Sequence, residues 1–180
     1  MSRIVPNIDS LELHQKLLNS DPERYRPDHC PSCQSSNIWS HGHYLRKPDR
    51  GLESGGCFNP VMILRYLCAA CGKTCSRLPQ CIAPRRWYLW LVQQWILKAL
   101  LRGKSLNEVS QHFFPCKRTV MRWKCWLYER SECFRFHLAT LYPEWGVQTE
   151  VKGYWLQAWE SAELSLLMAT LNRHGVSVPS

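Results

Sequence analysis

The chain carries two cysteine pairs of identical spacing, Cys30-Pro31-Ser32-Cys33 and Cys68-Ala69-Ala70-Cys71. Each pair can direct two thiolates to one tetrahedral metal ion, as in structural zinc sites, where the Zn–S distance is about 2.3 Å. Two such pairs in one short chain are a specific metal-binding signal. We therefore predict one structural zinc ion bound by Cys30, Cys33, Cys68 and Cys71, with no open coordination position for catalysis.

The segment between the two pairs predicts a β-hairpin. Residues 38–45 and 61–67 are rich in β-favouring side chains, and residues 47–56 contain the turn formers Pro, Asp, Ser and Gly. A hairpin would bring the two pairs together, as one shared ion requires. The 34-residue gap between the pairs exceeds the commonest spacing, and the turn-rich loop accounts for the excess. We expect residues 30–78 to form a zinc ribbon.

Other cysteines and histidines could also bind metal. Cys75, His29, His41 and His43 lie near the pairs, but four cysteines already complete a set, so we expect these residues to be surface or core side chains. The remaining thiols lack paired spacing and are expected to be structural or incidental: Cys57, Cys81, Cys116, Cys125 and Cys133.

The cysteine count must also be weighed against the cellular compartment. Ten cysteines would suggest disulfides in a small secreted protein, but residues 1–7 lack the apolar core and cleavage site of a signal peptide. We therefore expect reduced thiols and a cytoplasmic, nucleoid-associated protein. The most apolar stretch, residues 87–101, contains two glutamines and a lysine and is too short and too polar to cross a bilayer. We expect no membrane partner.

Residues 79–140 predict three helices. Pro84 and Gly103 bound the first, residues 85–101, whose expected apolar face contains Trp87, Trp90, Leu91, Trp95, Leu97 and Leu101. The sequence Ser105-Leu106-Asn107-Glu108 matches a capping box and begins a second helix, residues 106–113. After a turn at 114–116, a third helix is expected over residues 117–130, with a possible extension to 138 and an inner face of Val120, Trp123 and Leu127.

The two ends of the chain carry weaker signals. Within residues 1–29 we expect a helix over 9–19, capped by Ser10, followed by a polar linker. Residues 141–180 contain a helical pattern over 154–171, closed by Gly175, with no assigned role. The fold class expected is mainly α with a small β zinc ribbon, the ribbon preceding a helix-turn-helix domain at residues 79–140.

Positive charge is concentrated in the middle of the chain. The net charge is +9, and the segments 1–60, 61–130 and 131–180 carry 0, +11 and −2. Clustered Lys and Arg gain affinity for a phosphate backbone by releasing its condensed counterions. A nucleic acid is therefore the expected partner, while a general solubility bias would also make such a surface positive.

The sequence resembles the zinc-ribbon plus helix-turn-helix proteins, and the N-terminal modules, of bacterial insertion-sequence transposases. The features that carry this resemblance are the two cysteine pairs, residues 64–74, the junction from Leu78-Pro79 to residues 85–88, and residues 117–123. The resemblance implies sequence-specific binding of double-stranded DNA, with the third helix in the major groove. The implied contact residues on that helix are Lys117, Arg118, Thr119, Met121 and Arg122.

Two of these side chains have an expected role of their own. Arg118 and Arg122 stand one helical turn apart, and each could fork onto a guanine edge. Lys104 and Lys124 are expected near the phosphates. Solvated charges on an ordinary bundle helix would give the same pattern.

The sequence predicts no catalytic activity. Transposases of this kind cut DNA with a two-metal site of acidic residues, and this chain contains no aspartate after Asp49. The glutamates that remain, Glu53 among them, lack a sheet pattern to hold them. We expect a DNA-binding accessory or regulatory protein of a mobile element, or the DNA-binding half of a transposase, with a catalytic transposase subunit as a second candidate partner. The oligomeric state is open.

One alternative belongs to another functional class. A zinc ribbon can bind RNA or dock on a protein, and bases or a partner would then contact exposed aromatic rings. The candidates for such contacts are Trp39, Tyr44, Tyr66 and Trp87.

Overall fold

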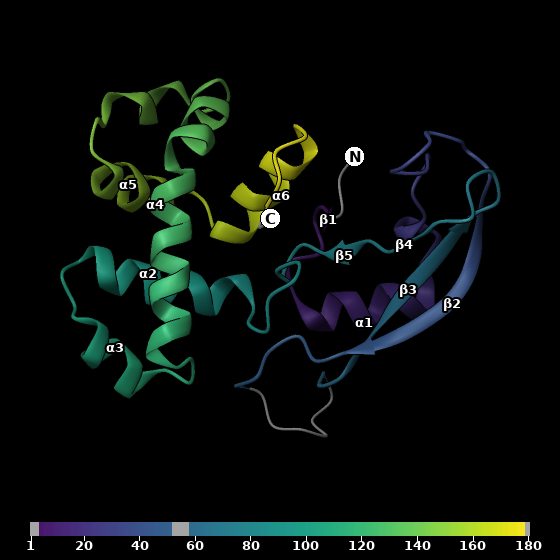
Figure 1. The fold of residues 1–180 in the computed structure, drawn as a ribbon, viewed down its shortest axis with the longest axis horizontal. Helices are drawn as coiled ribbons and strands as arrows, with labels where there is room; N and C mark the ends of the chain where they lie inside the picture. Colours follow the sequence, from purple (N-terminus) through teal and green to yellow (C-terminus); the bar gives the residue numbers. More distant parts are fainter. Residues whose placement is uncertain (1–3, 52–57, 179–180) are drawn as a thin grey trace.

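The computed structural model describes residues 4–51 and 58–178 of the chain. A β-hairpin occupies one end of the long axis, and most of the helices gather at the other (Figure 1). About half of the described chain is helical, and the strands form two small sheets. Cys57, Glu53 and the turn residues at 54–56 lie outside the described residues.

The predicted hairpin is confirmed. Strand β2 (Ile38–Arg46) pairs antiparallel with β3 (Val61–Cys68), and β4 (Thr74–Cys75) pairs antiparallel with the other edge of β3. The register between β2 and β3 shifts between Ser40 and His43. Gly42 adopts φ +76° at this bulge, a backbone conformation that glycine reaches at little cost.

The N-terminal segment joins the two halves of the molecule. The predicted helix is α1 (Leu11–Ser20), and the Ser10 hydroxyl accepts a hydrogen bond from the Leu13 amide as its N-cap. The expected polar linker instead contains a 3-10 turn, η1 (Pro22–Tyr25), with Tyr25 buried. Strand β1 (Ile4–Val5) pairs in parallel with β5 (Leu78–Pro79).

Helix α2 (Trp90–Leu101) begins at Trp90, so the predicted start at Arg85 was wrong. The preceding residues cannot continue a helix, because Arg85 adopts φ +55° and the Trp90 amide donates to the Cys81 carbonyl. The predicted stop is confirmed. Gly103 has φ +97°, and the amides of Gly103 and Lys104 donate to carbonyls of the last turn, as in a Schellman motif.

The predicted apolar face of α2 was partly wrong. Trp90, Leu97 and Leu101 are buried as expected, but Leu91 and Trp95 are exposed, and Trp87 is exposed before the helix begins. The buried stripe of the helix also includes Ile96 and Leu100, whereas Leu91 and Trp95 lie one turn apart on the face turned away from the core.

The next two helices follow the sequence closely. Helix α3 (Leu106–His112) begins with both hydrogen bonds of the predicted capping box. Helix α4 (Lys117–Ala139) includes the whole extension that the sequence allowed. Val120, Trp123 and Leu127 are buried, as predicted.

The C-terminal segment packs against the rest of the helical core. A 3-10 turn, η2 (Pro143–Val147), precedes α5 (Val151–Ser161) and α6 (Leu164–Arg173). The single helix predicted over 154–171 was wrong, because Ala162 is extended and the Leu164 amide donates to Gln94 Oε1 instead of continuing a helix. Gly175 has φ +80° after α6.

The core of the helical part is rich in aromatic rings. Trp90 stacks on Trp126 with ring centroids 6.2 Å apart, and Phe134 contacts both Trp126 and Trp155 edge to face. The N-terminal strand belongs to this unit, since Ile4 lies in the same cluster and its amide donates to Asn172 Oδ1 on α6. No helix within the described ranges is long and apolar enough to cross a membrane.

Candidate metal centre and basic groove

The structure brings the four predicted ligands together. The sulfur atoms of Cys30, Cys33, Cys68 and Cys71 all lie within 4.8 Å of one another. The Cys30–Cys71 and Cys33–Cys68 sulfur pairs are 3.7 and 3.5 Å apart. Four thiolates around a tetrahedral zinc ion, at Zn–S distances of about 2.3 Å, would be about 3.8 Å apart. This cluster could therefore hold a metal ion.

The two cysteine pairs are built by the same backbone turn. In the first, the Gln34 amide donates to the Cys30 carbonyl and the Cys30 amide to the Ser35 carbonyl, at 3.0 and 2.8 Å. In the second, Gly72 and Lys73 make the equivalent bonds with Cys68, at 2.9 and 3.0 Å. The residue after each pair has positive φ, +62° at Gln34 and +68° at Gly72. Each turn therefore directs its two sulfurs to the same side.

Backbone amides favour the thiolate form of Cys30. Backbone hydrogen bonds from Cys33 and Ser32 hold the pKa of the Cys30 thiol below its usual value. Cys30 and Cys68 are buried, Cys71 is half-buried and Cys33 is exposed. The ion would therefore be enclosed mainly by the hairpin and the first cysteine turn.

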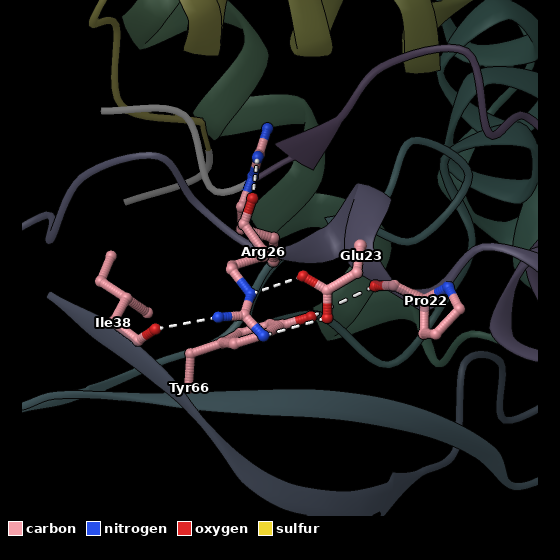
Figure 2. A network of polar contacts seen from close by, with 6 residues as sticks. Pro22, Glu23, Arg26, Ile38 and Tyr66 are labelled. Atoms are coloured by element: carbon pink, nitrogen blue, oxygen red, sulfur yellow. Dashed lines mark hydrogen bonds and ion pairs between the residues drawn. The ribbon is translucent and has the colours of Figure 1, made fainter. Parts of the chain in front are cut away.

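A polar network fixes the chain just before the first cysteine pair (Figure 2). The guanidinium of Arg26 forms an ion pair with Glu23 at 2.7 Å, and its Nη1 donates to the Ile38 carbonyl at the start of β2. The Tyr66 hydroxyl donates to the Pro22 carbonyl at 3.4 Å, and the Arg26 guanidinium lies 6.0 Å from the Tyr66 ring centroid. The turn η1 is thereby attached to both long strands.

Within the described chain, no other sulfur or imidazole group belongs to this four-cysteine group, although Cys75 packs beside it. His29, His41 and His43 are exposed, and Cys75 is half-buried on β4. Burial raises the pKa of the Cys81 thiol to about 12, as suits a core residue. The thiols of Cys116 and Cys125 are exposed, and Cys133 is half-buried.

The N-terminal half of α4 presents most of the expected DNA-contact residues to solvent. Lys117, Arg118, Met121 and Arg122 are exposed, and Thr119 is half-buried. Lys117 Nζ donates to Asn107 Oδ1 on α3 at 2.7 Å, which ties the two helices together.

The two lysines expected near phosphates differ in their surroundings. Lys104 is exposed and pairs with Glu108 at 3.4 Å. Lys124 is half-buried, and its Nζ lies 6.0 Å from the Tyr128 ring centroid. Lys104 is therefore paired with the first turn of α3, and Lys124 lies near a ring one turn further along α4.

A groove runs beside α4, with a volume of about 660 Å³. We call it the basic groove, and its charged and aromatic lining includes Arg50, Arg85, Arg86, Trp87, Arg122 and Glu129. These residues come from the hairpin loop, the segment before α2, and α4. The positive charge of residues 61–130 is visible in the sequence, but the meeting of these side chains in one groove is not.

Comparison with known proteins identifies a family, but its description gives no function. A family described as a domain of unknown function, DUF6431, matches residues 30–123. The chain belongs to the DUF6431 family. No curated protein and no solved structure matches it.

The DUF6431 match begins at the first metal-ligand candidate and ends within α4. It therefore includes all four clustered cysteines, α2 and α3, and the exposed residues Lys117, Arg118, Met121 and Arg122. The described groove residues Arg50, Arg85 and Arg86 also lie inside it, whereas Glu129 lies beyond it. The cysteine cluster and most of the basic groove thus belong to one DUF6431 unit.

Proposed function

We propose that this protein binds double-stranded DNA in a sequence-specific way, with α3 and α4 acting as a helix-turn-helix. The observation that carries the proposal is the exposed face at the start of α4, which presents Lys117, Arg118, Met121 and Arg122 to solvent, the last two of them also lining the basic groove. A helix with such a face can enter the major groove while flanking arginines meet the phosphates. Helix α3 would cross the backbone in front of it.

The cysteine cluster has a structural role in this proposal. Four thiolates complete the coordination of one zinc ion and leave no position for a substrate. The ligands join the segment before β2 to the end of β3, so that zinc would close the ribbon. The ion would stabilise the fold and take no part in chemistry.

The biological setting rests on the sequence resemblance. Similarity to DNA-binding modules of insertion-sequence transposases supports a role as an accessory or regulatory protein of a mobile element. The proposal includes no catalytic step, since the sequence has no aspartate after Asp49. A separate transposase subunit would supply the cleavage activity.

The RNA-binding alternative retains part of its expected surface. Trp39 and Trp87 are 61% and 53% exposed and could stack on bases. Tyr66 is 2% exposed and packs under Arg26, so it cannot take that role without a rearrangement. The exposed cations of α4 favour a duplex as the main ligand.

The test is selection of a duplex from a random pool, followed by binding titrations at several salt concentrations. Arg118→Ala should cost about 1–3 kcal/mol at the selected site and flatten discrimination among sequences. Lys104→Ala and Lys124→Ala should weaken binding to all duplexes and lower the salt slope by about one unit each. Lys16→Ala, on the exposed side of α1, is the matched control and should change neither.

Two results would contradict the proposal. The first is a wild-type protein without salt-dependent affinity for any duplex. The second is preferential binding of single-stranded RNA of the same sequence, lost on Trp39→Ala or Trp87→Ala, which would favour the alternative.

A further inference from the structure

The basic groove is assembled from three separated parts of the chain. Arg50 comes from the loop after β2, Arg85 and Arg86 from the segment before α2, and Arg122 from the exposed face of α4. A second hollow of about 780 Å³ continues from it along β2 and shares Arg50, Arg85, Arg86 and Trp87. The positive surface beside α4 therefore extends onto the ribbon.

Hydrogen bonds to backbone carbonyls hold the end of β2 and the hairpin loop against the segment before α2. Arg46 Nη2 donates to the carbonyls of Ala83 and Arg86 at 2.7 and 2.9 Å. The Arg50 amide donates to the Trp87 carbonyl at 2.9 Å, and the Arg50 guanidinium lies 4.6 Å from the Trp87 ring centroid. Arg50 is thus held in place before any ligand arrives, which lowers the entropic cost of binding.

Arg86 is the most enclosed cation of the groove. Its guanidinium lies 4.1 Å from the Trp126 ring centroid, and Nη1 donates to the neutral Gln93 Oε1 at 2.7 Å. Burial, and after it the positive charge of Arg122, lower the pKa of this guanidinium to about 10. Two like charges therefore act on each other across the groove.

Among the described residues that line the groove, four are arginines and one is a glutamate, so the carboxylates do not balance the positive charge. Asp49 accepts from the amides of Gly51 and Leu89, at 2.7 and 3.0 Å, and so is occupied by the backbone. Glu129 lines the groove from α4. The two ion pairs that join described residues, Glu23–Arg26 and Lys104–Glu108, involve none of the groove arginines.

We propose that the basic groove binds a backbone phosphate of the DNA duplex, with Arg86 and Arg122 as its ligands. This inference rests on the proposed function and changes one assignment within it. Arg122 becomes a backbone contact, and base reading falls to Lys117, Arg118 and Met121. A phosphodiester would supply the negative charge that offsets the two guanidinium groups. The fork of N–H donors on a guanidinium also matches the geometry of the phosphate oxygen atoms.

A DNA strand fits this site better than a free anion does. The positive surface continues from α4 through Arg85 and Arg50 to Arg46 and Lys47 along the second hollow, which suits a chain of phosphates. The ribbon would then position the helices on the duplex by holding the strand beside the major groove. Sequence-independent contacts of this kind fix register and orientation.

The first experiment compares Arg122→Ala with Arg118→Ala in the full-length, zinc-loaded protein. Binding is titrated on the selected duplex and on duplexes with single base-pair changes, at several salt concentrations. Arg122→Ala should lower the affinity for all duplexes by a similar factor, about 10- to 100-fold. It should also lower the slope of log affinity against log salt concentration by about 0.9. Arg118→Ala should instead lose affinity mainly for the selected duplex.

The second experiment locates the phosphate. Single methylphosphonate substitutions, which remove the charge of one phosphate, are placed in turn along the selected duplex. At one position, the methylphosphonate should weaken binding of the wild-type protein. At that same position it should cause no further loss of affinity in the Arg122→Ala or Arg86→Gln variant. Arg86 also packs on Trp126, so urea unfolding first checks that each Arg86 variant is folded. Arg86→Lys, which keeps the charge, is then compared with Arg86→Gln. Arg86→Lys should retain part of the lost affinity.

The outcomes separate this inference from the function on which it rests. If wild type binds no duplex, the proposed function fails. If wild type binds DNA but Arg122→Ala alters the order of preferred sequences, Arg122 reads bases and the inference is overturned. If no methylphosphonate position loses its effect in the Arg86 and Arg122 variants, the groove does not hold a phosphate and the inference is likewise overturned.

Discussion

A hydrogen bond joins Asp49, in the hairpin loop, to Leu89, the residue just before α2. Oδ2 of Asp49 accepts a hydrogen bond from the Leu89 amide at 3.0 Å, across 40 residues of sequence. Leu89 is the N-cap of α2 and offers no side-chain acceptor, and the carboxylate of Asp49 satisfies the Leu89 amide, which has no partner within the helix. Its other oxygen accepts from the Gly51 amide at 2.7 Å.

Asp49→Ala should therefore destabilise the fold by about 1–3 kcal/mol, because two amides lose a buried acceptor. Asp49→Asn should cost less, since its carbonyl oxygen can keep one of the two bonds. Urea unfolding measures both, with Asp9→Ala, at an exposed position, as the control. An Asp49→Ala protein as stable as the control would show that the carboxylate does not satisfy the Leu89 amide in solution.

Metal removal should unfold the ribbon. Deprotonated thiolates must converge on the ion, so binding should supply folding free energy on the order of 10 kcal/mol. We expect one zinc ion per chain, and Cys30→Ser or Cys71→Ser should lose it together with protease resistance of the hairpin. Cys125→Ser, an exposed thiol outside the cluster, should retain both. Clearly less than one zinc per chain in protein purified without chelator would contradict the assignment.

The stability should also fall in mild acid because of His14. Its ring is buried between α1, η1 and β3, with Nδ1 2.5 Å from the Tyr25 hydroxyl and Nε2 2.9 Å from the Met62 carbonyl. Burial lowers the pKa of His14, although the Met62 carbonyl acts in the opposite direction. The folded state therefore holds the neutral ring and binds fewer protons than the unfolded state just below the model-peptide pKa of about 6.5.

The sign of this effect is a loss of stability as the pH falls below about 6.5, by up to about 1.4 kcal/mol per pH unit until the folded pKa is reached. Zinc thiolates also protonate in acid, so the comparison must isolate His14. Urea unfolding at pH 7.5 and pH 5.5 should show a smaller acid-induced loss in His14→Gln than in wild type. His43→Gln, on the exposed face of β2, should behave as wild type does. An equal loss in all three proteins would remove His14 as the cause.

Local signals in the sequence were sufficient for most elements of the fold. The cysteine spacing, the capping box at Ser105 and the stop at Gly103 each depend on a few neighbouring residues, and the structure confirms the cysteine cluster, the box and the stop. Contacts between distant residues account for the errors. At the start of α2 the amides of Leu89 and Trp90 donate to Asp49 and to the Cys81 carbonyl instead of to a preceding helical turn, and Gln94 accepts from the Leu164 amide between α5 and α6.

The same reasoning explains what the sequence could show of the candidate sites. The paired thiols can be recognised in the sequence because two cysteines separated by two residues can bind one metal ion from a single backbone turn. The basic groove is not, since Arg50, Arg86 and Arg122 come from different elements and meet through the packing of the hairpin loop on α2 and α4. Only the excess charge of residues 61–130 pointed to it.

The last prediction concerns the bond that ties α4 to α5 inside the aromatic core. Ser131 Oγ donates to the Leu127 carbonyl at 2.6 Å and accepts from Trp155 Nε1 at 2.9 Å, and neither side chain is exposed. Ser131→Ala removes the acceptor and leaves the indole N–H buried without a partner, which should cost about 1–3 kcal/mol of unfolding free energy. Ser161→Ala, at an exposed position at the end of α5, should change it by less than about 0.5 kcal/mol.

A double-mutant cycle separates the bond from packing. Trp155→Phe removes the N–H but also leaves a cavity, so its own cost is large. If the bond contributes as the geometry suggests, Ser131→Ala should cost clearly less in the Trp155→Phe background than in wild type, because no indole N–H is then left unpaired. Equal costs in the two backgrounds, measured by urea unfolding of the zinc-loaded protein, would assign the effect of Ser131 to its Leu127 contact alone.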